Sequence, residues 1–94
     1  MLKFEWDEKK NKTNIEKHGI SFEEAASVFS DDEALIILDE EHSQKEERFM
    51  LIGFSYKANL LVVCHCYREN ETTIRIISAR KANANERKEY VNNL

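Results

Sequence analysis

Two arginines on one expected strand give the first chemical signal in this chain. Residues 72–80 read TTIRIISAR, a β-branched run that is typical of a strand ending at Arg80. Because neighbouring side chains on a strand alternate between its faces, we expect Arg75 and Arg80 on opposite faces, with Arg80 at the strand's end. A guanidinium on a rigid element can grip a phosphate through two parallel hydrogen bonds. The pattern therefore favours phosphate-bearing substrates, RNA above all.

The side chains needed for metal-free RNA cleavage are also present. This reaction uses the ribose 2′-hydroxyl as the nucleophile, and it needs a base, an acid and fixed positive charge on the phosphate. The base or the acid could be one of three histidines, because histidine is the side chain that titrates near neutral pH. Glu47 could also be the base, or it could orient an arginine. The histidines are His18, His42 and His65. Positive charge could come from Lys17, Arg48, Arg68, Arg75 and Arg80.

Each candidate also has a purely structural interpretation. For Arg80 we favour function, because it lies at a strand's end. Arg68 ends the preceding strand and could lie close to Arg80, or it could be a surface charge. His18 is expected at a helix C-terminus, where a protonated imidazole stabilises the helix whether or not it takes part in catalysis. His42 is in a charged loop, where a solvated histidine is the commoner outcome.

The strand expected over residues 60–68 offers further candidates on one of its faces. His65 and Tyr67 share a face with two apolar residues, and the alternate positions are more apolar still: Leu60, Val62, Cys64 and Cys66. We therefore expect the second set to face the core. On that interpretation His65 and Tyr67 lie on the open face, where they could stack on RNA or donate hydrogen bonds to it.

The cysteines do not predict a metal or redox site. Cys64 and Cys66 lie two apart, which is neither a C-x-x-C motif nor a spacing for an unstrained disulfide. His65, between them, should point to the other side of the strand, so a zinc site formed by these three residues and His42 would need a bulge. We expect reduced, buried thiols, no metal and no cofactor.

Composition and charge limit the possible classes of protein. The 94 residues are 41% hydrophobic and predict one domain over residues 1–94, with no membrane-length apolar run and no signal-peptide pattern, so we expect a cytoplasmic protein. The net charge of −4 is unevenly spread, because residues 20–47 hold one Lys against ten Asp and Glu. A local basic site remains possible elsewhere, but strong nonspecific binding to long nucleic acid does not.

Capping residues, turn residues and hydrophobic periodicity predict the helices and strands. Asp7 can cap a helix that runs to about His18 and stops at Gly19, Ser21–Glu24 reads as a capping box, and Asn83–Glu86 caps a last helix. Strands are expected over 34–38, 48–55, 60–68 and 72–80, with turns near 57–59 and 69–71. Short links favour antiparallel neighbours. The expected fold is a two-layer α+β domain, with helices on one sheet face and the other face open as a platform for RNA.

The chain also resembles a known family. Residues 17–25 read KHGISFEEA, a block that resembles one in BrnT-type toxins. Asp7, Lys10 and Asn14 fit the family's spacing upstream of it. Further matches follow in the right order over nearly the whole chain: His42, Glu47, Arg48, Gly53, Leu61 to Val63, Arg68, Ile76 to Arg80, Ala82, Glu86 and Arg87.

The resemblance implies a RelE-like ribonuclease toxin of a type II toxin–antitoxin pair, which blocks translation by cutting RNA. It also implies a partner, a BrnA-like ribbon-helix-helix antitoxin, expected in a two-plus-two complex that reaches operator DNA only through the antitoxin. One alternative is a non-catalytic module that holds a ribbon-helix-helix transcription factor. Direct DNA binding is disfavoured by the overall charge and by the lack of a helix dense in Arg or Lys.

Overall fold

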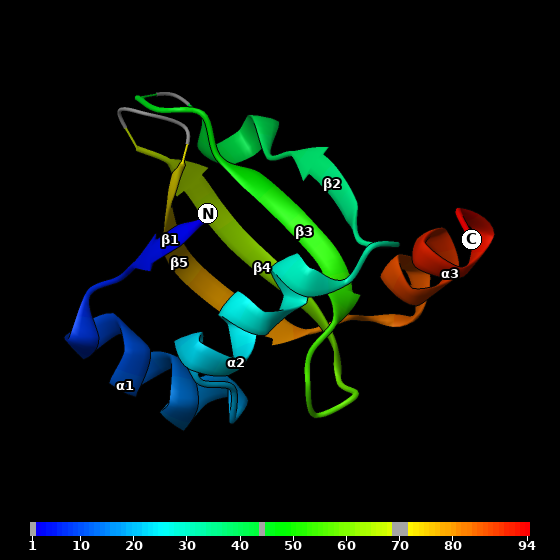
Figure 1. Cartoon of the computed structure of the whole chain (residues 1–94), viewed down its shortest axis with the longest axis horizontal. Coiled ribbons are helices and arrows are strands. Elements are labelled where there is room, and N and C mark those ends of the chain that lie inside the picture. The colour runs from blue at the N-terminus through cyan, green and yellow to red at the C-terminus, as the bar shows by residue number, and fades with distance from the viewer. Residues whose placement is uncertain (1, 44, 69–71) are drawn as a thin grey trace.

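A five-stranded sheet forms the centre of the computed structural model, which describes residues 2–43, 45–68 and 72–94. Its order is β1-β5-β4-β3-β2 (Figure 1). β1 pairs in parallel with β5, and the other neighbours are antiparallel. The bounds are β1 Lys3–Glu5, β2 Leu35–Leu38, β3 Phe49–Phe54, β4 Leu60–Tyr67 and β5 Thr73–Lys81. The predicted α+β fold with a mainly antiparallel sheet is confirmed, while the predicted turn at 69–71 lies outside the described residues.

The helices begin and end at the predicted signals. The Asp7 carboxylate accepts from the Lys9 amide at 2.8 Å at the start of α1 (Glu8–His18), which Gly19 ends with a φ of 70°. The Ser21 hydroxyl accepts from the Glu24 amide at the start of α2 (Phe22–Ser27). Two short 3₁₀ segments follow, η1 (Val28–Ser30) and η2 (Glu40–His42), and α3 (Ala84–Asn92) has the predicted capping box.

One predicted cap is incomplete for a structural reason. The Glu24 carboxylate does not accept from the Ser21 backbone amide. It accepts from the Ser55 hydroxyl at 2.7 Å and from the side-chain amide of Asn59 at 2.8 Å. It therefore ties α2 to the β3–β4 turn.

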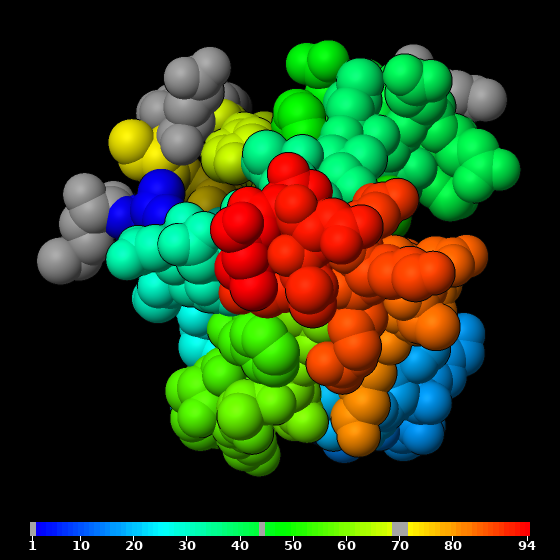
Figure 2. All heavy atoms as spheres, turned by 90° about the vertical axis from the view of Figure 1, so that its right-hand side faces the viewer, coloured from blue at the N-terminus to red at the C-terminus, as the bar shows by residue number. Residues whose placement is uncertain are grey.

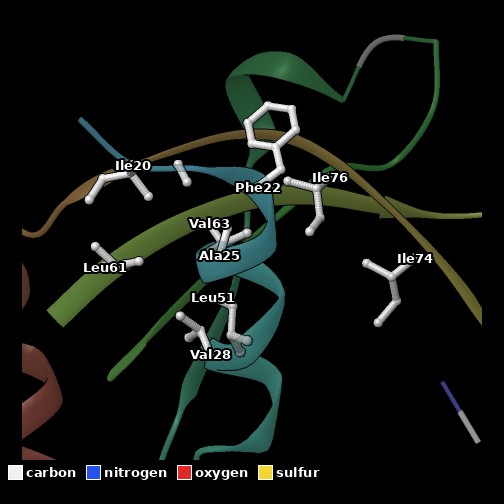
Figure 3. Packing of buried hydrophobic residues seen from close by; sticks show 10 residues of the cluster. Ile20, Phe22, Ala25, Val28, Leu51, Leu61, Val63, Ile74 and Ile76 are labelled. Atoms are coloured by element: carbon white, nitrogen blue, oxygen red, sulfur yellow. The ribbon is translucent and has the colours of Figure 1, made fainter. Parts of the chain in front are cut away.

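α2, with η1, covers one face of the sheet, which we call the covered face, and α1 lies along the β5 edge (Figure 1). Phe22, Ala25 and Val28 pack there on side chains from β3, β4 and β5, and all three are fully buried (Figure 3). β4 contributes Leu61 and Val63 to this layer. The predicted orientation of β4 is therefore wrong, because the helices cover the alternate set of residues from the one expected.

The other face, here the open face, is closed at one end by α3. Tyr90 packs with Ile52, Leu60 and Val62, and its hydroxyl donates to the Asp31 carboxylate at 2.8 Å. Burial and this bond raise the pKa of Tyr90 to about 12. Figure 2 shows α3, in red, at the surface of this end of the molecule. The prediction that helices lie on one face thus holds for α2, while α1 lies along the β5 edge and α3 packs on the open face.

A β-bulge changes the direction of side chains along β5. Cys64 pairs with Ser78, but the next residue of β4 pairs with Ile76, so Ile77 is an extra residue on β5. An extra residue inverts the alternation beyond it. Arg75 and Arg80 therefore lie on the same face, and the prediction of opposite faces is wrong.

Candidate active site on the open sheet face

A pocket of about 240 Å³ lies on the open face, and we call it the central pocket. Its floor comes from β3, β4 and β5, and its rim brings together a histidine and two of the predicted arginines. The lining residues are Asp39, His42, Arg48, Met50, Val62, Cys64, Ile77, Ser78 and Arg80. The sequence thus identified three rim residues, although they come from segments up to 38 positions apart (80 minus 42).

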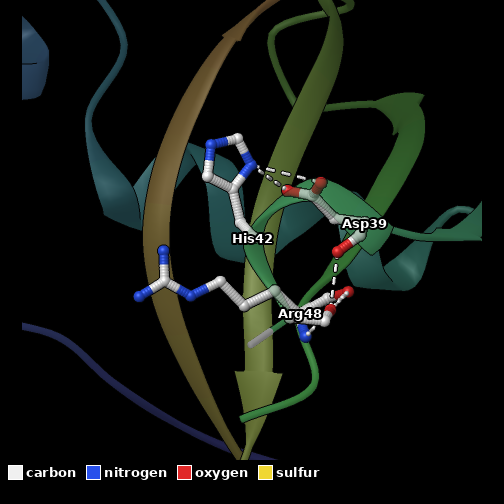
Figure 4. Close-up of polar contacts among 4 residues, drawn as sticks. Asp39, His42 and Arg48 are labelled. Carbon is white, nitrogen blue, oxygen red and sulfur yellow. Dashed lines mark hydrogen bonds and ion pairs between the residues drawn. The ribbon is translucent and has the colours of Figure 1, made fainter. Parts of the chain in front are cut away.

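A short hydrogen-bonded loop positions two of these side chains. The Asp39 amide donates to the Arg48 carbonyl at 2.8 Å, which closes the loop at its base. The Ser43 hydroxyl donates to the Asp39 carbonyl at 2.6 Å and accepts from the Arg48 amide at 3.0 Å. Figure 4 shows the His42 and Arg48 side chains extending from this loop on the side of β5.

His42 is held by a carboxylate. Its Nδ1 lies 3.0 Å from Asp39 Oδ2 and 3.2 Å from Oδ1, and the Asp39 side chain is only 12% exposed. When Nδ1 donates to Asp39, Nε2 carries the lone pair and can take a proton. The imidazole itself is 61% exposed, so a substrate hydroxyl can reach it. This is the arrangement of a general base with its orienting carboxylate.

The two arginines of the rim differ in what they bind. Arg80 makes a two-pronged ion pair with Glu86, with N–O distances of 2.7 and 2.8 Å, and the Glu86 hydrogen bonds raise the pKa of Arg80. The Asn83 amide also donates to Glu86, which fixes the carboxylate. Arg48 has a buried Nε with no hydrogen-bond partner among the described residues. Arg48, which lines the central pocket, therefore has a hydrogen-bond donor that no described residue uses.

Two other groups at this pocket could take part in chemistry. Burial raises the pKa of the Cys64 thiol, so it is a poor nucleophile at neutral pH. Asp39, Glu41 and His42 offer ligand atoms within 4.8 Å of one another and could approach a metal ion together. The Asp39 and His42 side chains are already hydrogen-bonded to each other, and the Glu41 and His42 side chains are exposed to solvent.

Two predicted arginines lie at the opposite end of the sheet. Arg75 and Arg68 both pair with Glu5, at 2.9 and 3.5 Å. The Arg68 amide donates to the Thr73 carbonyl, at the start of β5, whereas Arg80 is near its end. In an antiparallel pair the end of one strand lies beside the start of the next. Of the two alternatives for Arg68, proximity to Arg80 is therefore wrong, and Arg68 is a half-exposed charge that pairs with Glu5.

The aromatic candidates on β4 are also away from the pocket. His65 is fully buried on the covered face, where its ring packs edge-on against Phe29 at 4.8 Å between centroids. Burial lowers the pKa of His65. Tyr67 contacts the His65 and Phe49 rings at the end of the strand. The predicted placement of His65 and Tyr67 on the open face is wrong, and His65 has no surface with which to bind RNA.

The remaining candidates fall in neighbouring regions. Lys17 and His18 line a groove of about 300 Å³ between α1 and β5, the α1–β5 groove. Glu47 is exposed and does not line the central pocket. A second cavity of about 530 Å³, which we call the outer hollow, lies beside this pocket. Its lining residues are Glu41, His42, Lys45, Glu46 and Arg48. Asp39 was not predicted as a site residue. Its position three residues before His42, within one 3₁₀ turn, was the available signal.

Comparisons with known proteins show the family of the chain. A family model described as "Ribonuclease toxin, BrnT, of type II toxin-antitoxin system" matches residues 6–86. Among solved structures, the chain is similar to the Brucella abortus ribonuclease toxin BrnT, with 28% identity, a TM-score of 0.65, and coverage of 88% of this chain and 99% of that one. No curated protein matches significantly. Among the described residues, no helix has the length and apolar character to cross a membrane. The chain belongs to the BrnT family of ribonuclease toxins of type II toxin–antitoxin systems.

Proposed function

We propose that this protein cleaves RNA in the central pocket without a metal ion, by attack of a ribose 2′-hydroxyl on the neighbouring phosphate. The observation that carries the proposal is one pocket that holds an Asp39-oriented His42, an Arg48 with an unpaired Nε, and Arg80. These supply the base and the positive charge that the reaction requires within one cavity.

The residues have distinct roles in this reaction. His42 Nε2 takes the proton of the 2′-hydroxyl, and Asp39 stabilises the imidazolium that forms. The 2′-oxygen bonds to phosphorus while the bond from phosphorus to the 5′-oxygen breaks, and the leaving oxygen takes a proton from an acid or from water. The products are a 2′,3′-cyclic phosphate and a 5′-hydroxyl. Arg48 and Arg80 stabilise the negative charge that builds on the phosphate oxygens.

The experiment is single-turnover cleavage of a defined RNA in EDTA. Arg80→Ala should lose about 3–4 kcal/mol of transition-state stabilisation, a rate loss of roughly a hundred- to a thousandfold. Arg80→Lys should recover part of the rate, since a point charge cannot make the two-pronged contact. The His42→Ala variant should also cleave RNA slowly, because it lacks the proposed base. Arg87→Ala is the matched control, because Arg87 is exposed on α3 and lines none of the pockets described above.

Several outcomes would contradict the proposal. An unchanged rate in folded Arg80→Ala removes Arg80 from the mechanism. Cleavage that needs a metal ion and leaves 5′-phosphates overturns the reaction class. The absence of any cleavage by the wild type would favour the non-catalytic binding module.

The cellular role follows from the same activity. Cleavage of RNA by this chain would inhibit translation, and translation in an extract should stop with wild type and continue with Arg80→Ala. Membership of a type II family implies a cognate protein antitoxin. We propose that it is a ribbon-helix-helix protein in a two-plus-two complex that alone contacts operator DNA. Co-purification with the neighbouring gene's product and a measured mass test this; recovery of the toxin alone counts against it.

A further inference from the structure

The α1–β5 groove is a second basic feature beside the central pocket. Lys9, Lys10, Lys17 and His18 of α1 line it, and all four are exposed. Among the described residues, none of the three lysines forms an ion pair and no acidic side chain lines the groove. Three lysine charges therefore line one channel within a protein whose net charge is −4, and the Asp7 carboxylate that interacts with Lys10 lies outside the groove lining.

The groove and the central pocket are neighbours that share two lining residues. Ile77 and Ser78 line both of them, so the bulge of β5 forms their shared boundary. Lys10, Asn14 and Lys17 lie at helix positions i, i+4 and i+7, on the side of α1 that meets β5. The buried Asn14 amide donates to the Ala79 carbonyl at 2.8 Å and accepts from the Ala79 amide at 3.1 Å. These bonds fix the lysines relative to the strand that carries Arg80.

The opposite side of the central pocket has a different charge. The outer hollow adjoins the pocket through His42 and Arg48, but its other lining residues are of mixed charge, with Glu41 and Glu46 beside Lys45. A polyanion whose phosphate lies between Arg48 and Arg80 meets two carboxylates in that direction, whereas the charged lining residues in the direction of α1 are all basic. The charge distribution therefore favours the route along α1.

We propose that the α1–β5 groove binds the phosphates of the RNA strand next to the cleaved bond, with Lys10 and Lys17 as the main contacts. This inference rests on the proposed function, since it extends the same substrate beyond the central pocket. Lys17 was already a candidate from the sequence, and the groove adds Lys9 and Lys10 to the same RNA-binding subsite. These contacts form equally in the ground state and the transition state, so they set affinity and not the maximal rate.

The test measures binding separately from cleavage. A fluorescent single-stranded RNA with 2′-O-methyl riboses cannot be cut by 2′-hydroxyl attack, and its affinity is measured by anisotropy from low to high KCl. Each phosphate contact to a single strand contributes about 0.7 to the slope of log affinity against log salt, so Lys10→Gln with Lys17→Gln should lower the slope by about 1.4. With cleavable RNA, the same double variant should need several-fold more protein for half-maximal rate and reach the wild-type maximal rate.

A charge-matched control separates this site from overall charge. Lys12→Gln with Lys88→Gln also removes two positive charges, but these lysines are exposed and line neither the groove nor the pocket. Equal slopes for the two double variants, or no binding of the RNA by wild type, overturn the inference. A lower slope for the groove variant alone supports it even if wild type cuts no RNA, and in that case the proposed function fails while the binding groove stands.

Discussion

The two faces of the sheet are built from the same strands and have opposite characters. On the covered face, β3, β4 and β5 present apolar side chains to α2, and even its one histidine is fully buried. On the open face, the same strands form the floor of a pocket whose rim is charged. Alternation along each strand produces both surfaces from one segment. The difference shows that residues one position apart in β4 can belong to the apolar core in one case and to the floor of the central pocket in the other.

The largest expected effect is on the covered face. Phe22→Ala removes a fully buried ring at the start of α2 and should lower the free energy of unfolding by about 3–5 kcal/mol, because it leaves a cavity in a layer closed on all sides. Urea denaturation measures this. Ile77→Ala, at the half-buried boundary of the open face, is the comparison and should cost less than half as much. Equal losses would mean that the two faces do not differ in packing.

An intermediate effect is expected on the open face, at a residue that acts through Arg80. Glu86→Gln keeps an oxygen that can accept from the Asn83 amide but removes the charge that orients Arg80. We expect a maximal rate about tenfold lower, roughly 1.4 kcal/mol, with little change in the thermal midpoint. Single-turnover kinetics and thermal unfolding measure the two quantities. A lower midpoint with an unchanged maximal rate would make Glu86 a structural residue of α3 alone.

The smallest expected effect is at His65. Its Nδ1 donates to the Val63 carbonyl, its Nε2 is buried without a partner, and burial lowers its pKa from 6.5. Below pH 6.5 the unfolded chain therefore takes up a proton at His65 more readily than the folded protein does. The stability that depends on a neutral His65 is complete above pH 6.5 and is lost as the pH falls. His65→Phe should keep the rate of RNA cleavage, keep stability at pH 7.5 within about 1 kcal/mol, and flatten the loss of stability in acid.

Unfolding curves from pH 7.5 to 5 for wild type and His65→Phe measure that difference. An unchanged acid slope would show that His65 does not titrate with unfolding. A large loss of RNA cleavage in the folded variant would contradict its assignment to the covered face.

Local signals in the sequence were sufficient for the helices. Asp7, Ser21 and Asn83 act on backbone groups two or three residues away, and Gly19 acts through its own φ, so the printed residues contain the whole interaction. Arg80 was identified because a guanidinium at a strand's end can bind phosphate, and His42 because a histidine can act as an acid or a base. The same reasoning could not reach Asp31, whose carboxylate joins β3 to α3.

Face assignment failed where two alternatives had nearly equal composition. Both alternate sets of β4 are mainly apolar, and the set with His65 and Tyr67 was taken as the more polar one. The choice depends on which set meets Phe22 and Val28, and that contact joins distant parts of the chain. The bulge at Ile77 also has no local signal, because it lacks the glycine that marks many bulges. It moved Arg75 to the face of Arg80.

Asn14 has a consequence for how the molecule behaves among its own copies. β1 pairs with β5 only over residues 73–75, so the rest of that strand would present free N–H and C=O groups along an edge. Such an edge invites pairing with another chain and then aggregation. The Asn14 amide has the same donor and acceptor as a peptide group, and it occupies both backbone groups of Ala79. One side chain of α1 thereby takes the place of a missing strand at Ala79 and leaves these two backbone groups unavailable to a neighbouring chain.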